Sequence, residues 1–362
     1  MLRRRERGQR PPRAHGDGPR RGRGPRRDGA LAAQRGGPRG VAVGAGRLRR
    51  RGGARLPRRD ARVLRHRAPL PRRAGRRVAR TGGPLVLPDI GALRPWEDPA
   101  VTSLRRLPMH ATIRRDDAIS LDGEWRLAVH PHPDAVPESA IVGEPAGVPV
   151  QVPGNWTLQG IDGERPHYTN VQMPFPGPPP RLPERQPTGV YRRAFGLAPR
   201  PRGTRTIVQV GAAESVHAVW VNGDFVGYGT DSRLSSEYDA TDAVRDGTNE
   251  IAIVVWRWSA HSYLEDQDQW WMAGLHRSVT IERRPPVHVA DVHCDTDLDP
   301  RTGTGRVRVA TRVACSHESA PGWTVRTRLI APGGARVGRD AEGAVPHLRD
   351  AGGAGPHLHD AS

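Results

Sequence analysis

The stretch VHAVWVNGDFVGY at residues 216–228 predicts two antiparallel β-strands joined by a tight turn. Apolar runs lie on both sides of Asn222-Gly223, and this dipeptide between two such runs is a strong short-range signal for a hairpin. Further along, EIAIVVWRW at residues 250–258 carries apolar side chains on both faces of an extended chain, which is typical of a central strand in a β-sandwich. We therefore expect an all-β fold.

Other short apolar runs, each bounded by turn residues, extend this pattern toward both ends of the chain. Strands are predicted at residues 121–129, 206–210 and 278–281. Residues 134–190, in contrast, are dense in proline and glycine and are predicted to be mostly loop. A loop of this length inside a compact domain is usually functional or disordered, and the aromatic residues that it holds favour a function.

A second unit is predicted after the pair Pro285-Pro286, which has the character of a linker. Alternating runs at residues 287–292, 305–313 and 325–330 have the spacing of strands in an antiparallel, immunoglobulin-like β-sandwich. Beyond these runs the chain turns to glycine, alanine, aspartate and histidine. This composition predicts a disordered tail rather than a metal site.

The charge of the chain is unevenly distributed. Its 57 basic residues are all arginine, and with 38 acidic residues the formal net charge is +19. Residues 1–84 hold 28 of these arginines and only four acids, so the remainder is mildly acidic. The segment has no Phe, Trp or Tyr for stacking on bases. We therefore predict a disordered or spuriously translated leader, and nucleic acid is not the expected partner; the alternative, a polyanion-binding arm, would bind with a strong salt dependence.

Cysteine content and hydropathy predict a cytoplasmic protein. Cys294 and Cys315 are the only cysteines, too few for a disulfide framework or a zinc site, and are most simply two thiols in a reducing compartment. No apolar run approaches the roughly 20 residues of a transmembrane helix. The arginines at 3–5 are followed by polar residues instead of the apolar core of a secretion signal. We therefore expect no membrane partner.

The stretch YLEDQDQWWMAG at residues 263–274 is the strongest candidate for a binding site. It sets carboxylates, among them Asp266 and Asp268, beside Trp270 and Trp271. Carboxylates accept hydrogen bonds from hydroxyls, and flat apolar rings cover the C–H faces of a sugar, so the combination suits a polyhydroxylated ligand. In the alternative interpretation, Asp266 or Asp268 caps backbone N–H groups while both tryptophans fill a sandwich core.

Several segments together resemble the β-galactosidases of glycoside hydrolase family 2, in the order of that family. They are WEDP at 96–99, LDGEWR at 121–126, VPGNW at 152–156, YTNV at 168–171, PTG at 187–189, DSRLSSE at 231–237 and LEDQDQW at 264–270. The resemblance covers about residues 96–313. β-Glucuronidases and β-mannosidases share the architecture, and the EDQD run together with YTN favours a galactosidase.

The resemblance implies a jelly-roll β-sandwich followed by an immunoglobulin-like one. We accordingly predict a disordered Arg/Gly/Pro-rich leader at 1–90, a galactose-binding-like jelly-roll domain at 91–286, an incomplete immunoglobulin-like β-sandwich at 287–335 and a disordered tail at 336–362. The family's catalytic TIM barrel takes about 250 residues. Only 76 residues follow Pro286, so we expect the barrel to be absent from this sequence.

The resemblance also implies two substrate-binding residues. By motif position, Asn170 would hydrogen-bond the substrate, and Asp268 would bind the galactosyl group together with a sodium ion. Hard cations take oxygen ligands, which suits a carboxylate. In the alternative interpretation, the side-chain amide of Asn170 hydrogen-bonds backbone groups of its own loop and does not contact substrate. Magnesium is expected in the complete enzyme, with ligands outside this chain.

The implied activity is hydrolysis of terminal non-reducing β-D-galactose residues in β-D-galactosides such as lactose. A retaining glycosidase needs two carboxyl groups about 5–5.5 Å apart, and in this family both are glutamates of the barrel. We therefore predict no catalytic residue in this sequence and no turnover by the chain alone. The alternatives are a noncatalytic galactoside-binding module and a complementing chain that pairs with a catalytic chain or forms a homo-oligomer.

Overall fold

The computed structural model describes Leu87, residues 89–113, 115–170, 172–265, 268–315 and 323–344, and the backbone of 358–361. The leader expected at residues 1–90 lies outside the described residues except at its end. There, Leu87 and Ile90 are 2% and 1% exposed, so the folded region begins slightly earlier than predicted.

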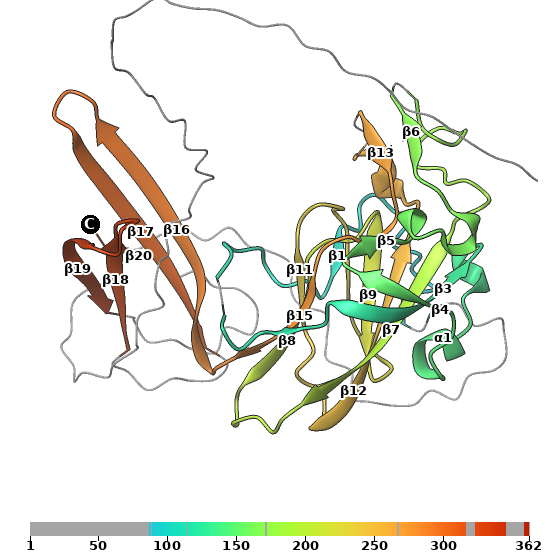
Figure 1. Cartoon of the computed structure of the whole chain (residues 1–362), viewed down its shortest axis with the longest axis horizontal. Coiled ribbons are helices and arrows are strands. Elements are labelled where there is room, and N and C mark those ends of the chain that lie inside the picture. The colour runs from blue at the N-terminus through green and yellow to red at the C-terminus, as the bar shows by residue number, and fades with distance from the viewer. Residues whose placement is uncertain are drawn as a thin grey trace, which may run out of the picture. The chain divides into compact units, whose positions relative to one another are not determined.

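The larger sheet has seven strands, and each strand pairs antiparallel with its neighbours (Figure 1). Its order is β1 (Ser103–Leu104), β10 (Asp224–Gly229), β9 (Val216–Val221), β12 (Gly247–Trp256), β7 (Thr188–Leu197), β3 (Gly123–His130) and β4 (Val148–Val152). The predicted hairpin is confirmed as β9 and β10. Asn222 and Gly223 at its turn have φ of 51° and 88°, the positive values that a type I′ turn requires.

A second sheet of four strands packs against the first and completes a β-sandwich. Its order is β11 (Ser236–Asp239), β8 (Arg205–Val210), β15 (Val279–Arg284) and β2 (Ile119–Ser120). One core cluster contains residues of both sheets, including Trp125 and Ile253 from the first and Tyr238 and Ile281 from the second. The predicted all-β fold is therefore confirmed.

Strand β12 is buried on both faces, as its sequence predicts. Ile251, Ile253 and Val255 point into the core between the sheets. On the opposite face, Trp256 belongs to a second core cluster and stacks on Trp96 with ring centroids 4.9 Å apart. The segment that carries Trp96 and the short helix α1 (Ser139–Val142) contribute residues to this second cluster.

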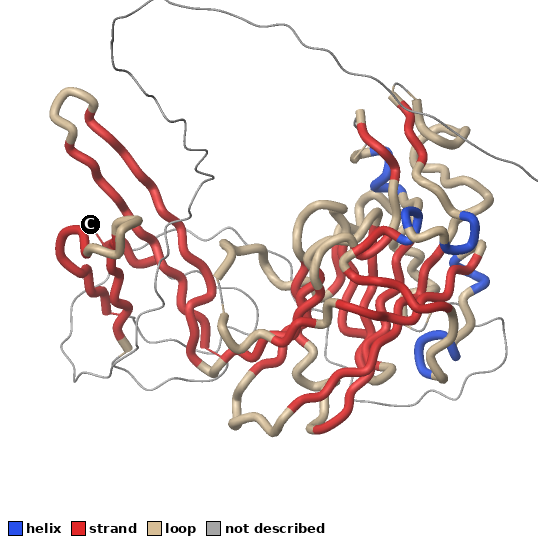
Figure 2. Tube along the Cα trace, in the orientation of Figure 1, coloured by secondary structure: helices blue, strands red, loops and turns tan. Residues whose placement is uncertain are grey.

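The loop region 134–190 contains several short elements (Figure 2). Besides α1 and β4, they are η1 (Pro133–Ala135, at its start), β5 (Gly154–Asn155), η2 (Trp156–Leu158), η3 (Ile161–Gly163) and β6 (His167–Thr169). Strand β5 pairs with β14 (Gly274–Leu275), and β6 pairs with β13 (Gln269–Trp271), which follows η4 (Ala260–Tyr263). The predicted loop is thus fixed to the stretch that holds the candidate site.

The strands predicted after residue 286 are present and longer than expected. They are β16 (Val287–Asp299), β17 (Thr304–Cys315) and β18 (Thr324–Ile330). Two further strands, β19 (Arg336–Ala344) and β20 (Leu358–Ala361), were not predicted. Strand β19 corrects the tail predicted to start at 336. It pairs with β18, and Arg328 of β18 forms an ion pair with Asp340 of β19. No helix among the described residues is long and apolar enough to cross a membrane.

Candidate functional site

The two-stranded sheet of β6 and β13 brings the two predicted site residues to one place (Figure 1). Its register pairs Thr169 with Gln269 and Tyr168 with Trp270. Asn170 follows β6 directly and Asp268 precedes β13 directly, so the same register sets these two positions opposite each other. Because side chains alternate along a strand, Tyr168, Asn170, Asp268 and Trp270 share one face. We call this set of four residues the aromatic–acid face.

The aromatic–acid face is open to solvent. Tyr168 and Trp270 are 47% and 55% exposed, and their ring centroids lie 5.4 Å apart at an interplanar angle of 45°. The Tyr168 hydroxyl donates to Oδ1 of Asp268 at 2.5 Å. This hydrogen bond raises the pKa of Tyr168 above its ordinary value. Two large rings left in water beside a carboxylate and an amide are available to a ligand with both hydroxyls and C–H faces.

The two tryptophans of the motif have opposite environments. Trp271 points to the other face of β13, is 4% exposed, and its Nε1 donates to Oγ1 of Thr169 at 2.8 Å. It packs against Trp258, with centroids 5.6 Å apart, in a small core cluster that includes Phe175. The expectation that both rings face a ligand is therefore wrong for Trp271. The alternative that both fill the core is wrong for Trp270.

The chain before β6 is held by buried charges that the sequence did not identify. Glu164 is 5% exposed and accepts hydrogen bonds from Arg257 and Arg185. Arg257 also donates through Nη2 to the carbonyl of Arg165 at 2.8 Å. A buried carboxylate that is paired and hydrogen-bonded to this extent fixes the loop that leads into β6.

The described residues supply one carboxylate for the predicted sodium ion. Oδ1 of Asp268 already accepts from Tyr168, and no group of three or more His, Cys, Asp or Glu side chains gathers among the residues that the structure describes. Asp266, which the alternative interpretation uses as a cap, lies outside the described residues. An exposed carboxylate fits a single oxygen ligand of a hard cation, whose remaining ligands have to come from elsewhere.

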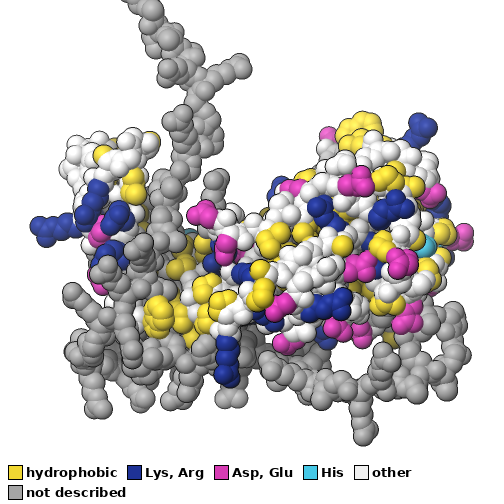
Figure 3. Space-filling model, turned by 60° about the horizontal axis from the view of Figure 1, so that its bottom comes forward, with side chains coloured by type: hydrophobic (Ala, Val, Ile, Leu, Met, Phe, Trp, Pro, Cys, Tyr) yellow, Lys and Arg dark blue, Asp and Glu magenta, His cyan; other side chains and the backbone are white. Residues whose placement is uncertain are grey.

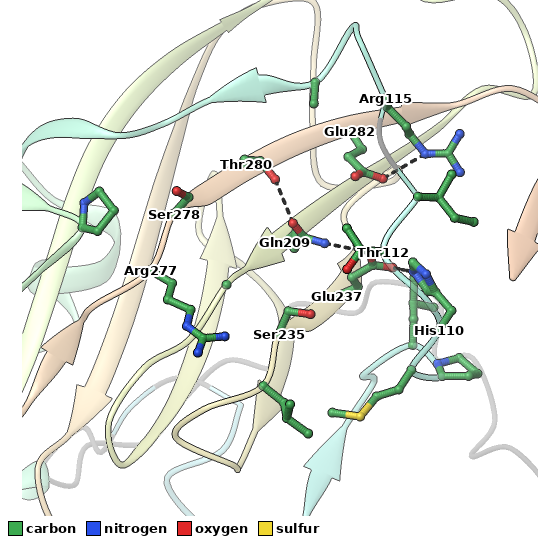
Figure 4. A pocket seen from close by; sticks show the side chains of 18 of the residues that line it. His110, Thr112, Arg115, Gln209, Ser235, Glu237, Arg277, Ser278, Thr280 and Glu282 are labelled. Carbon is green, nitrogen blue, oxygen red and sulfur yellow. Dashed lines mark hydrogen bonds and ion pairs between the residues drawn. The ribbon is translucent and has the colours of Figure 1, made fainter. Parts of the chain in front are cut away.

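A separate cavity of about 890 Å³ lies over the four-stranded sheet (Figure 4). We call it the sheet groove. Its floor includes Gln209, Glu237, Thr280 and Glu282, and residues of the segment 107–118 line it as well. Its lining includes no residue of the aromatic–acid face.

The two buried glutamates of the sheet groove, Glu237 and Glu282, are both ion-paired. His110 contacts Glu237 at 2.9 Å, Arg284 contacts Glu237 at 2.6 Å and Glu282 at 2.8 Å, and Arg115 contacts Glu282 at 3.2 Å. Burial alone would raise the pKa of Glu237, but hydrogen bonds from His110 and Arg284 lower it to about 2. The same hydrogen bond to Glu237 raises the pKa of His110. Figure 4 shows Glu237 between Gln209 and His110, with Arg277 apart from this network.

The charges on the surface are mixed in sign. On the face seen in Figure 3, arginine side chains alternate with acidic side chains across the described residues. A surface of this kind lacks the single-sign stripe of a nucleic-acid-binding face there.

Comparisons with a family model and with curated proteins both find similarity to glycosyl hydrolases. Residues 118–285 match the family described as "Glycosyl hydrolases family 2, sugar binding domain". The chain is 40% identical to a β-galactosidase of Erwinia tasmaniensis over 261 residues, which is 68% of this chain and 25% of that protein. It is 39% identical to a β-galactosidase of Yersinia pestis over 245 residues, 63% of this chain and 23% of that protein. The chain thus spans about a quarter of the curated relatives that it matches.

A solved structure supports the fold. A β-glucuronidase of Bacteroides uniformis superimposes with a TM-score of 0.51 at 15% identity, over 68% of this chain and 28% of that chain. At this identity the likeness concerns the fold alone.

Proposed function

We propose that the chain, whose residues 118–285 match the sugar-binding domain of glycosyl hydrolases family 2, recognises β-D-galactosides as part of a β-galactosidase. The proposed overall reaction is the hydrolysis of terminal non-reducing β-D-galactose residues. Support for galactosides comes from the β-galactosidases at about 40% identity. The observation that carries the proposal is the aromatic–acid face.

The geometry of this face suits a sugar with adjacent hydroxyls. The carboxylate of Asp268 accepts hydrogen bonds from hydroxyls, and the amide of Asn170, on the opposite strand, both donates and accepts. The rings of Trp270 and Tyr168 offer an apolar surface to the C–H face of the pyranose. Because polar groups at fixed positions discriminate between hydroxyl configurations, this pair would supply selectivity and the rings would supply contact area.

The chemistry of hydrolysis is proposed to lie outside the described residues. A retaining glycosidase uses two carboxyl groups about 5–5.5 Å apart, one as nucleophile and one as acid and base. Asp268 is the only carboxylate of the aromatic–acid face, so we give it a binding role. A part of the enzyme beyond the described residues, or a complementing chain, would carry the catalytic pair and the magnesium ligands.

We further propose that the Asp268 carboxylate binds a sodium ion. A bound sodium ion would offer a positive charge to the sugar hydroxyls beside the carboxylate. Oδ2 of Asp268, which accepts no hydrogen bond from another described residue, is the oxygen we assign to it.

Titration calorimetry with lactose tests the proposed binding role. We expect millimolar lactose to bind the wild-type chain, and Asp268→Ala to weaken binding about 100-fold, because two or more charge-assisted hydrogen bonds are lost. Asp116→Ala is the matched control, since Asp116 is an exposed carboxylate that lines the sheet groove. Absence of heat with the wild type, or equal loss in both variants, would contradict the proposal.

A noncatalytic galactoside-binding module is the second candidate, and the same exposed face favours it. A nitrophenyl galactoside assay separates the two. Turnover by the purified chain well above that of Asp268→Ala indicates an enzyme. Lactose binding without turnover, and turnover only after a catalytic chain is added, indicates a binding or complementing role.

A further inference from the structure

The sheet of β6 and β13 is too small to hold its own geometry. It has three residues in each strand, and an isolated two-stranded ribbon is marginally stable at best in water. On the core side, Trp271 fixes its far end. Asp268 lies at the near end of this sheet. A separate contact has to hold that end if the orientation of the Asp268 carboxylate is to be fixed.

Arg233 occupies the place of that anchor. Its Nη1 donates to Oε2 of Glu214 at 2.9 Å, and its Nη2 donates to Oε1 of Gln269 at 3.0 Å. Gln269 is the first residue of β13 and the direct neighbour of Asp268. The planar guanidinium therefore bridges two acceptors, which a lysine ammonium could not do in a fixed fork geometry.

Both ends of this bridge are themselves held. Glu214 has a side chain that is 6% exposed, and its Oε1 accepts from the backbone N–H of Met272 at 2.9 Å. The loop that carries Arg233 is shaped by Asp231, whose Oδ1 accepts from the N–H groups of Arg233 and Leu234 at 3.0 and 3.1 Å. One carboxylate thus fixes the end of β13 and, through Arg233, its beginning.

A further contact joins the same loop to the chain just before Asp268. The N–H of Ser232 donates to Oε1 of Glu265 at 3.0 Å. Residues on both sides of Asp268 are thereby tied to the segment 231–234.

We propose that Arg233 is a positioning residue for sugar recognition, which acts by holding Gln269 so that the Asp268 carboxylate stays opposite Asn170. The inference rests on the proposed galactoside-binding function. Arg233 itself lies on the other side of β13 from the aromatic–acid face, because it contacts Gln269 and side chains alternate along the strand. Its effect on a sugar is therefore indirect.

Two variants test the bridge without leaving Glu214 as an uncompensated buried charge. Arg233→Lys keeps a positive charge beside Glu214, and Gln269→Ala keeps the pair of Arg233 and Glu214 intact. Each is expected to speed amide hydrogen exchange across residues 268–272 and to weaken lactose binding about tenfold at a temperature where circular dichroism shows a folded protein. The double variant should be no worse than either single variant, because both remove one contact.

Arg205→Ala is the matched control. Arg205 donates through Nε and Nη2 to the Asp239 carboxylate on another strand pair, so this variant also removes a partly exposed arginine–carboxylate pair. We expect it to leave exchange at 268–272 and lactose affinity unchanged.

The outcomes separate the inference from the function on which it rests. Unchanged exchange at 268–272 in Arg233→Lys and Gln269→Ala overturns the inference, whether or not lactose binds. Faster exchange with unchanged lactose affinity also overturns it, since a purely structural contact would behave in that way. If the wild type does not bind lactose, the proposed function fails, and the exchange measurement alone decides whether Arg233 holds β13.

Discussion

The aromatic–acid face and the sheet groove show how differently polar groups are used in one sandwich. In the groove, Glu237 and Glu282 are buried and each has cationic partners within 3.2 Å. On the aromatic–acid face, Asp268 is exposed, has one hydrogen bond from a tyrosine, and lies beside a ring that is 55% exposed. The two buried carboxylates of the groove are ion-paired, whereas the exposed carboxylate of the aromatic–acid face has no cationic partner among the described residues. Ligand recognition is therefore expected at the face and stability in the groove.

The largest effect is expected when a groove charge loses its partner. Glu237→Ala leaves His110 and Arg284 without this carboxylate in a buried setting, and breaking a buried pair in this way costs about 3–5 kcal/mol. Urea unfolding should show this loss of free energy of unfolding, while lactose affinity of the folded protein stays unchanged. A loss of lactose binding in the folded variant would place the sugar in the groove.

The pH dependence of stability follows from the same pair. Because the pKa of Glu237 falls from its ordinary 4.5 to about 2 in the folded chain, its contribution is present above pH 4.5 and is lost as the pH falls toward 2. The pKa of His110 is raised above 6.5, so its contribution is full below pH 6.5 and is lost as the pH rises through the folded value. The pair therefore stabilises most between pH 4.5 and 6.5.

The pH dependence of the Glu237 contribution can be measured by comparing the wild type with Glu237→Gln. The free energy of unfolding of the wild type minus that of the variant should fall by about 3 kcal/mol between pH 5 and pH 2, as expected for a shift of this size in one carboxyl group. A difference that stays constant over this range would show that Glu237 is not held as a buried carboxylate.

Substitutions of the two adjacent tryptophans are expected to affect different properties, the stability of the fold for Trp271 and lactose binding for Trp270. Trp271→Ala should lower the free energy of unfolding by about 3 kcal/mol, because it empties part of the cluster with Trp258 and Phe175. Trp270→Ala should change it by less than about 0.5 kcal/mol, as is usual for an exposed side chain. In lactose titrations the order reverses, since Trp270→Ala removes a ring contact that contributes about 1 kcal/mol. Equal effects on stability would contradict the assignment of the two faces.

The smallest effect is expected from Tyr168→Phe. This change keeps the ring and removes the hydroxyl that donates to Asp268, so lactose binding should weaken about threefold. In the opposite experiment, Asp268→Ala should return the pKa of Tyr168 toward its ordinary value of 10, measured by ultraviolet titration of the phenol. A tyrosine titration that is the same in wild type and variant would show that the two side chains are not in contact.

Much of the sandwich could be predicted because its signals are local. The Asn222-Gly223 turn and the two-faced pattern of β12 depend on neighbouring residues, and both are confirmed. The predicted tail starts too early, since Arg336–Ala344 forms a mostly exposed polar strand that pairs with β18 and carries cross-strand ion pairs with it.

The candidate site depends on contacts that are distant in sequence. Asn170 and Asp268 were predicted from their motifs, but their opposition across one ladder follows from the register of β6 and β13, about 100 residues apart. The split between Trp270 and Trp271 follows from strand alternation once β13 is known. The bridge through Arg233 joins three separate segments, and no local pattern in the sequence indicates it.

The most direct test of where the sugar binds is a lactose titration of the isotopically labelled chain followed by nuclear magnetic resonance. We predict that the indole N–H of Trp270 and the backbone amides of Tyr168, Asn170 and Asp268 shift with lactose concentration, while the amides of Gln209, Glu237 and Thr280 in the groove stay fixed. Shifts confined to the groove residues, with Trp270 unchanged, would contradict the account.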